Sequence, residues 1–520
     1  DESDVGGCGF ETDRMRFLGR GRTLRHAQAM QPGAILSNTC GCVLDPVFSL
    51  RRHVNVAPGS SVHVAFWTAL ADSREGALAL VQPLLESGAC ERVLASARTR
   101  VLAEQARLGV DTAQAKRFGE FAGALVHANK GWRAPSAMLE RGNGGSPVLW
   151  SCGISGDRAI VLARIGADSG LAGVDELLLA QQYWQSKRLG VDVVLLDTVV
   201  GDDDPLHGKL HERVQAQEAR LKVDAQAIAA AVFNLRDTAI SDAVRAGLNT
   251  VARIVLDTER GLVAPVANNV DSNPAVSPAA AGTARVQSRT TDEPKVRASG
   301  DMHAAREFDN GTGGFVDSGR AYAITLTGNH CTPEPWVNII ANPSFGFVVS
   351  SEGGGYAWSL NSQQNPLTPW PNDPVSDTPH EVLYLRDNDS SDLWSATPLP
   401  IRLANLTWNV VHGKGYSRFK HEAHGVEVTL LQFVPPADPV KLSRLTLCNR
   451  SSRIRHLSVT GYVEWALGPN GTVPAPFVTT SVDGATDALM ARNAWRAEFA
   501  EHVAFIDLGG RQASCTGDRL

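Results

Sequence analysis

HLSVTGYVEWAL, residues 456–467, decides the fold of the C-terminal half of the chain. Its apolar positions alternate with polar ones, and they are Leu457, Val459, Val463 and Trp465. A period of two residues is typical of a strand with one buried face. VEVTLLQFV at 426–434 begins with the same alternation, and Gly, Pro and Asn turns separate further short runs. The pattern predicts an antiparallel β-sandwich over 305–515.

The N-terminal half follows a helical period instead. In DTAQAKRFGEFAGALVHANK (111–130) the apolar residues recur every three or four positions, at Phe118, Phe121, Ala122, Leu125 and Val126. This spacing predicts an amphipathic helix, with Asp111 and Gln114 as its N-terminal capping pair. Similar Ala- and Leu-rich stretches predict that 73–261 is mainly helical, with one strand at 191–200.

Two further segments separate or precede these regions. Residues 35–66 carry short apolar runs between Asp-Pro and Pro-Gly pairs, which predict strands and turns. Residues 262–304 contain no aromatic residue and are rich in Pro, Ala, Ser, Asn and Thr. Because such a segment buries too little apolar area to offset its chain entropy, it is predicted to be a linker.

Composition excludes several classes of protein. The 520 residues include 49 Lys and Arg against 55 Asp and Glu, a formal charge of −6. The chain therefore lacks the basic footprint of a nucleic-acid binder. No stretch reaches the ~18 consecutive apolar residues that a membrane-spanning helix needs. The eight cysteines form no CxxC pair, so the sequence indicates neither a metal site nor a cofactor.

Residues 329–400 are the densest mixture of aromatic and polar residues in the chain. Four of the eleven tryptophans lie there, among several Asn and Asp residues. Sugars present apolar C–H faces ringed by hydroxyls, so a saccharide site combines an aromatic platform with amide and carboxylate partners. Composition alone leaves the alternative open that the tryptophans are sandwich core and the Asn and Asp residues form turns. No pair of carboxylates has a spacing that singles out a proton donor.

Several long strings resemble those of one bacterial enzyme family. They include ETDRMRFLGRGRTLR (11–25), LDPVFSLRRHV (44–54), YAWSLNSQQNPLTPWPNDPVSD (356–377), HGKGYSRF (412–419) and DPVKLSRLTLCN (438–449). Nearly the whole chain resembles the cyclic β-1,2-glucan synthases. The C-terminal strings are also similar to the cellobiose and chitobiose phosphorylases of glycoside hydrolase family 94, formerly glycosyltransferase family 36.

The resemblance implies an α+β multidomain protein with a mainly helical, α/α-toroid-like N-terminal part and then an antiparallel β-supersandwich. The expected divisions are the end of a first sandwich unit at 1–72, a helical domain at 73–261, the linker at 262–304, the supersandwich at 305–515 and the start of a further segment at 516–520. The last division rests on TGDRL at 516–520, whose Asp518-Arg519 aligns with Asp13-Arg14.

The resemblance also implies a function. The chain is expected to be an internal piece of a synthase that builds β-1,2-glucan from UDP-glucose, and to bind the growing glucan. The family's catalytic aspartate segment has no counterpart here, so the piece alone is expected to be inactive. Two alternatives stay open, an active fragment of a β-1,2-oligoglucan phosphorylase and a purely structural sandwich.

The expected partners are β-1,2-glucan and the remaining domains of the parent enzyme, on the cytoplasmic side of the bacterial inner membrane. The chain itself is expected to make no direct membrane span and to use no cofactor. The candidate glucan-binding residues are Trp336, Trp358, Asn361, Trp370, Asn372, Asp373 and Arg386.

Overall fold

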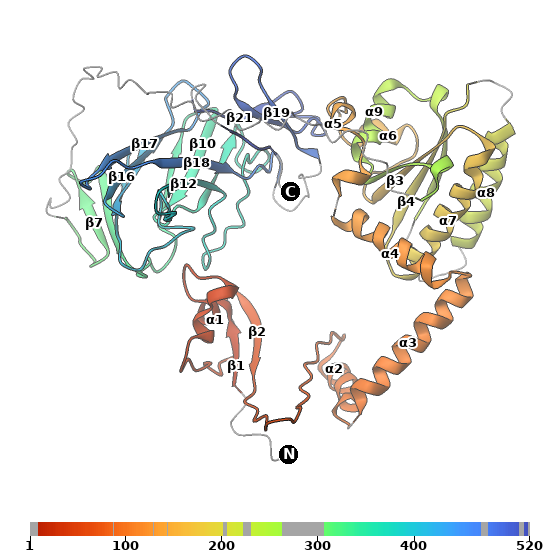
Figure 1. Ribbon diagram of the computed structural model, residues 1–520, viewed down its shortest axis with the longest axis horizontal. Helices are drawn as coiled ribbons and strands as arrows, with labels where there is room; N and C mark the ends of the chain where they lie inside the picture. Colours follow the sequence, from red (N-terminus) through yellow and green to blue (C-terminus); the bar gives the residue numbers. More distant parts are fainter. Residues whose placement is uncertain are drawn as a thin grey trace. The chain divides into compact units, whose positions relative to one another are not determined.

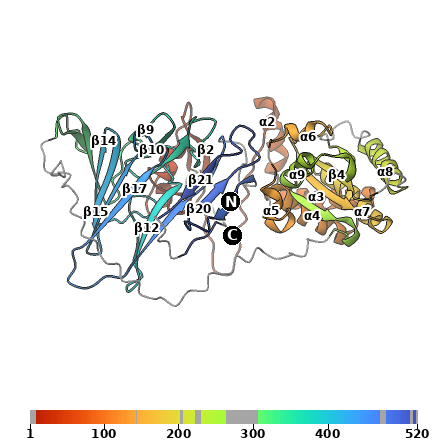
Figure 2. The same cartoon turned by 90° about the horizontal axis from the view of Figure 1, so that it is seen from above.

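A computed structural model describes residues 9–86, 88–127, 129–142, 144–200, 205–221, 230–262, 306–469, 477–508 and 514–517. They belong to two compact units, whose ribbons are drawn in Figures 1 and 2. The first unit comprises 1–58, 279–491 and 504–520, and the second comprises 59–278 and 492–503. The first unit is therefore built from segments that lie far apart in the sequence.

Antiparallel sheets form most of the first unit. The largest has the order β17-β16-β15-β14-β8-β7, and two smaller ones have the orders β11-β10-β9 and β13-β12-β18. Their strands are β7 (Gly313–Val316), β8 (Ala321–Thr327), β9 (Val337–Ala341), β10 (Phe345–Ser350), β11 (Gly355–Ser359), β12 (Glu381–Asp387), β13 (Leu393–Ser395), β14 (Thr407–Gly413), β15 (Tyr416–Ala423), β16 (Val426–Phe433), β17 (Leu442–Asn449) and β18 (Leu457–Val463). A further sheet joins β19 (Thr479–Val482), β20 (Leu489–Arg492) and β21 (Val503–Ile506).

The core of the sandwich lies between these sheets. Its largest buried side chains are Phe347, Trp394, Trp408 and Phe419. Strand β16 alternates buried and half-buried positions along its whole length, as the sequence predicts. Because burying one large apolar side chain contributes about 1.5–3 kcal/mol, these aromatic residues supply much of the stability of the unit.

The N-terminal segment of the first unit is a small module of its own. It contains β1 (Gly9–Asp13), the short helix α1 (Arg14–Leu18) and β2 (Pro46–Arg51), which pairs antiparallel with β1. The Asp13 side chain accepts hydrogen bonds from the backbone amides of Met15 and Arg16 and so begins α1. Figure 1 shows this module in red.

A four-stranded parallel sheet of order β5-β4-β3-β6 forms the centre of the second unit. Its strands are β3 (Ala159–Ile165), β4 (Val191–Asp197), β5 (Val232–Arg236) and β6 (Ile254–Asp257). The helices of the unit are α2 (Arg74–Val81), α3 (Ala89–Leu108), α4 (Thr112–His127), α5 (Ser136–Leu139), α6 (Pro147–Trp150), α7 (Leu171–Ser186), α8 (Pro205–Leu221) and α9 (Asp242–Val251). Helices α4, α7 and α8 share one buried apolar cluster with β3 and β4.

The helix predicted at 111–130 is confirmed as α4, and its capping pair is present. The amide of Gln114 donates to the Asp111 carboxylate over 2.7 Å, and the amide of Asp111 donates to the Gln114 side chain over 3.0 Å. Four of the five predicted apolar positions are buried or partly buried against the core. The prediction is wrong for Val126, because its side chain is 59% exposed.

The helix-rich character of 73–261 is confirmed, but the helices pack around a central parallel sheet, which a toroid of helices lacks. The predicted strand at 191–200 is β4. Within 35–66, Pro46–Arg51 is a strand, whereas 61–66 adopts none. Apart from residue 262, the predicted linker at 262–304 lies outside the described residues, as do 518–520. Among the described helices, none is both long and apolar enough to cross a membrane.

Candidate functional site

An aromatic cluster on β11 is the first feature of the candidate site. Tyr356 and Trp358 are two residues apart on this strand, so their side chains lie on the same face. Their ring centroids are 5.2 Å apart. The ring of Trp370 stacks on Tyr356 at 4.7 Å with an interplanar angle of 9°. Tyr356, Trp358 and Trp370 therefore form one platform, which we call the aromatic cluster.

A glycine on the neighbouring strand sets the position of Trp358. Gly346 of β10 lies directly opposite Trp358 in the antiparallel register. A Cβ atom at Gly346 would come within 2.3 Å of the indole ring. The ring consequently occupies the space that any other residue would fill. Tyr356 is buried, whereas Trp358 and Trp370 stay half-buried and reach the surface.

The loop after β11 brings Trp370 back to the cluster. The side-chain oxygen of Asn361 accepts hydrogen bonds from the amides of Gln363 and Gln364, each over 2.9 Å, and so forms the turn. Thr368 then accepts a hydrogen bond from the amide of Ala357 over 2.9 Å, which fixes the returning chain beside β11. Asn361 thus has the turn-forming role that the sequence left open, and its side chain is exposed.

Asp373 anchors the end of this loop. Arg14 donates to both of its carboxylate oxygens, over 2.8 and 2.7 Å. The Arg14 guanidinium therefore holds the pKa of Asp373 well below its usual range. The same carboxylate accepts the amides of Val375 and Ser376. Asp373 is thus an ionised structural partner, and the preceding Asn372 is an exposed turn residue with a φ of +49°.

Two of the predicted site residues lie in other surroundings. Trp336 packs edge-on against Tyr322, with ring centroids 5.8 Å apart, and contacts the sandwich core. Arg386 is exposed on β12, opposite Leu393. Its neighbour Asp387 is fully buried and forms ion pairs with arginines further along the chain. Adjacent strand residues point to opposite faces, so Arg386 and Asp387 do not pair.

A buried charged cluster around the GGG sequence at 353–355 was not predicted. Glu352 has no exposed surface and forms an ion pair with Arg402. Asp377 accepts a hydrogen bond from Ser350 over 2.7 Å and lies 3.3 Å from Arg20. Burial raises the pKa of Asp377, although both partners favour its charged form.

The glycines at 353–355 are the sequence signal for this cluster, since they permit close approach of the backbone. A Cβ atom at Gly354 would lie 2.0 Å from a carboxylate oxygen of Asp377. Each carboxylate of this cluster is paired with an arginine, Glu352 with Arg402 and Asp377 with Arg20, so loss of either arginine would leave an uncompensated buried charge. Within the described ranges, no group of three metal-ligating side chains comes together.

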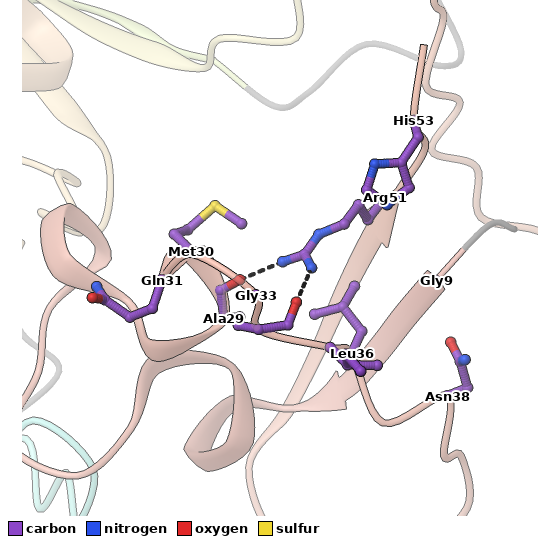
Figure 3. A pocket seen from close by; sticks show the side chains of 11 residues that line it. Gly9, Ala29, Met30, Gln31, Gly33, Leu36, Asn38, Arg51 and His53 are labelled. Atoms are coloured by element: carbon purple, nitrogen blue, oxygen red, sulfur yellow. Dashed lines mark hydrogen bonds between the residues drawn. The ribbon is translucent and has the colours of Figure 1, made fainter. Parts of the chain in front are cut away.

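A cavity of about 550 Å³ lies within the N-terminal module (Figure 3). Figure 3 shows the Arg51 guanidinium pointing to the backbone of Ala29, and the backbone of Ala34 is its second partner. The guanidinium donates to both carbonyl oxygens, to that of Ala34 over 2.6 Å. The lining side chains include no carboxylate and no tryptophan. The cavity therefore lacks the aromatic and acidic groups that the aromatic cluster and its loop combine.

Comparison with known proteins identifies the domain that carries the aromatic cluster. A family model described as "Glycosyl hydrolase 94, supersandwich domain" matches residues 2–86 and 320–520, more than half of the chain. The chain belongs to the glycosyl hydrolase 94 supersandwich family. Both matched segments of the supersandwich contribute to the first structural unit, through the N-terminal module and the sandwich. Membership of this family confirms the β-supersandwich that the sequence predicts.

The relatives of this supersandwich protein include both synthases and phosphorylases. The cyclic beta-(1,2)-glucan synthase NdvB of Rhizobium meliloti is 34% identical over 98% of the chain, which covers 18% of that protein. The N,N'-diacetylchitobiose phosphorylase of Vibrio furnissii is 31% identical over 30% of the chain and 19% of the relative. The solabiose phosphorylase of Paenibacillus borealis is 29% identical over 30% of the chain and 20% of the relative. The chain thus spans about a fifth of the length of these relatives.

Proposed function

We propose that this chain is a region of a cyclic β-1,2-glucan synthase and that its supersandwich binds the glucan at the aromatic cluster. The similarity to NdvB extends over nearly the whole chain, which supports the parent activity. The observation that carries the binding site is the stacked pair of Tyr356 and Trp370 with Trp358 beside it.

The geometry of the cluster suits a sugar ring. A pyranose packs its C–H face on an aromatic plane, and the half-buried indoles of Trp358 and Trp370 offer such planes at the surface. Their partner Tyr356 is buried, so the platform is held in place before any ligand arrives. Preorganisation of this kind lowers the entropy cost of binding.

Polar groups surround the platform in the proposed site. Asn361 and Asn372 are exposed at the two ends of the loop, where amide groups are able to donate to and accept from sugar hydroxyls. Asp373 acts through the loop, because Arg14 holds both of its oxygens. Trp336 and Arg386 belong to this proposal only as secondary contacts of a longer glucan chain.

The proposal extends to the parent protein. The remaining domains of the synthase would supply the glycosyl transfer and hold this region on the cytoplasmic side of the inner membrane. The proposed role of this chain is binding and does not include bond cleavage. A second candidate function is that of an oligoglucan phosphorylase, of which this chain would be a fragment. Only the similarity of the sandwich to the phosphorylases favours it.

A fluorescence titration of the full chain with β-1,2-glucooligosaccharides tests the binding proposal. We expect saturable quenching, and we expect Trp370→Ala and Trp358→Ala each to weaken binding at least tenfold, about 1.4 kcal/mol. Trp150→Ala is the matched control, since Trp150 lies in the second unit and is 62% exposed. A flat titration of the folded wild-type chain would contradict the proposal.

Two further outcomes separate the alternatives. Release of glucose 1-phosphate from the oligosaccharides in the presence of phosphate would support the phosphorylase function. If Trp370→Ala lowers the unfolding midpoint but leaves glucan affinity unchanged, the aromatic cluster is purely structural. Circular dichroism of each variant establishes that the sheets are intact before affinities are compared.

A further inference from the structure

The contact between the N-terminal module, residues 9–51, and the loop 373–377 of the sandwich has the character of a docking interface. Arg14 makes a bidentate ion pair with Asp373, and Arg20 pairs with Asp377. The amide of Gly21 donates to the carbonyl of Val375 over 2.8 Å. The interface therefore combines two charge pairs with a backbone hydrogen bond.

An apolar cluster completes this interface. Leu18 and Ala27 of the module and Val375 of the loop are all buried together, and Met15 and Phe17 pack against them. Buried apolar contact at the centre with charged pairs around it is the usual composition of a protein–protein interface. The module and the loop thus meet as two complementary surfaces.

The loop 373–377 also has contacts of its own within the sandwich. Asp373 accepts the amides of Val375 and Ser376, over 2.9 and 3.2 Å. Asp377 is held by the hydroxyl of Ser350, which belongs to the sandwich. The two acidic side chains consequently have partners within the sandwich in addition to those in the module.

The module likewise has its own internal contacts. The buried carboxylate of Glu11 accepts the amides of Thr12, Asp13 and Ser37. An isolated two-stranded sheet such as β1-β2 is marginally stable in water, so the module gains stability when it docks. Its connection to the sandwich runs through the second structural unit, so no short linker forces the two to meet within one chain.

We propose that the loop 373–377 is a receptor for the segment DRMRFLGRG (13–21) and accepts this segment from a second copy of the chain. Every contact described above can form between two chains without change, which is the condition for domain swapping. Because the connection is long, the module has a low effective concentration at the loop of its own chain. Docking on a second chain therefore competes with docking on the same chain once the protein concentration approaches that effective concentration. The proposal is independent of glucan binding.

Charge reversal in the full chain tests this exchange. Arg14→Asp and Asp373→Arg each break the Arg14–Asp373 pair, so neither variant closes the interface alone. In a mixture of the two, a swapped heterodimer restores a complementary pair at both interfaces. We expect light scattering coupled to size exclusion to detect at least tenfold more dimer in this mixture than in either variant alone. Differently tagged chains identify the heterodimer by co-purification.

Two controls make the result decisive. A mixture of Arg386→Asp with Asp373→Arg keeps only one complementary Arg14–Asp373 pair, because the exposed Arg386 is not part of the interface. It should therefore give less heterodimer than the complementary mixture. The single-chain double variant Arg14→Asp/Asp373→Arg should recover the unfolding midpoint lost by the single variants. If the single variants do not fold, wild-type chains carrying two different tags are mixed and cross-linked across a range of concentrations. Absence of mixed dimers in the complementary mixture, or in that wild-type series at millimolar chain concentration, would overturn the proposal.

Discussion

Two buried histidines in the sandwich predict a loss of stability in mild acid. His421 on β15 is 3% exposed, and its ring lies 5.7 Å from that of Trp408. Within the described residues neither of its ring nitrogens has a hydrogen-bond partner. Burial lowers the pKa of His421 to about 4, and it lowers the pKa of His412 to about 4 despite a hydrogen bond to the carbonyl of Trp336.

The direction of this pH dependence follows from the number of protons that the folded and unfolded chains bind. Between about pH 6.5 and the folded-state value of about 4, the unfolded chain binds a proton that the folded chain does not. The contribution of the neutral, buried histidine to the free energy of unfolding is therefore fully present above pH 6.5, and it is lost as the pH drops toward 4. From pH 7 to pH 5 each histidine removes about 2 kcal/mol from the free energy of unfolding, at about 1.36 kcal/mol per pKa unit.

Urea unfolding followed by tryptophan fluorescence measures this loss. The wild-type chain is compared with His421→Leu, which places an apolar side chain at the buried position that cannot take up a proton. We expect the variant to lose about 2 kcal/mol less than the wild type between pH 7 and pH 5. Equal losses in the two proteins would refute the assignment of this pH dependence to His421.

Three further substitutions test other parts of the fold, each by urea unfolding. Arg402→Met leaves Glu352 buried without its charge partner and should lower the free energy of unfolding by about 3–5 kcal/mol. Adding Glu352→Gln should recover part of this loss. An unchanged unfolding midpoint in Arg402→Met would mean that the pair is not buried. Gly354→Ala places a Cβ atom 2.6 Å from the backbone oxygen of Asp377, a clash that rotation of the carboxylate cannot relieve, and should cost more than about 1 kcal/mol. Phe118→Ala should cost about 3–5 kcal/mol, because its ring is fully buried, whereas Val126→Ala on the exposed face should change stability little.

Local patterns in the sequence predict individual elements well. The alternation of 426–434 predicts β16, because one face of that strand lies in the core. The capping pair Asp111 and Gln114 predicts where α4 begins, since both hydrogen bonds involve residues three positions apart. In each case the physical cause lies within a few residues of its effect.

Features that depend on distant partners escape such patterns. Strand β3 is apolar at every position except Arg164, and periodicity does not distinguish so short an apolar run from a buried helix, so the sequence does not predict the parallel sheet. The pairing of Asp373 with Arg14 is not predictable from local pattern, because the two residues lie 359 positions apart in the sequence. Tyr356 was overlooked because only the pairing of β10 with β11 and the returning loop place Trp370 on its ring.

Hydrogen exchange with mass spectrometry tests the central claim most directly. Backbone amide exchange of the full chain is measured with and without saturating β-1,2-glucooligosaccharide, since a bound ligand slows local opening of the segments it contacts. The account predicts slowed exchange in peptides that cover 355–373 and unchanged exchange in β3 and β4 of the second unit. Unchanged exchange over 355–373, with slowed exchange elsewhere in the chain, would contradict it.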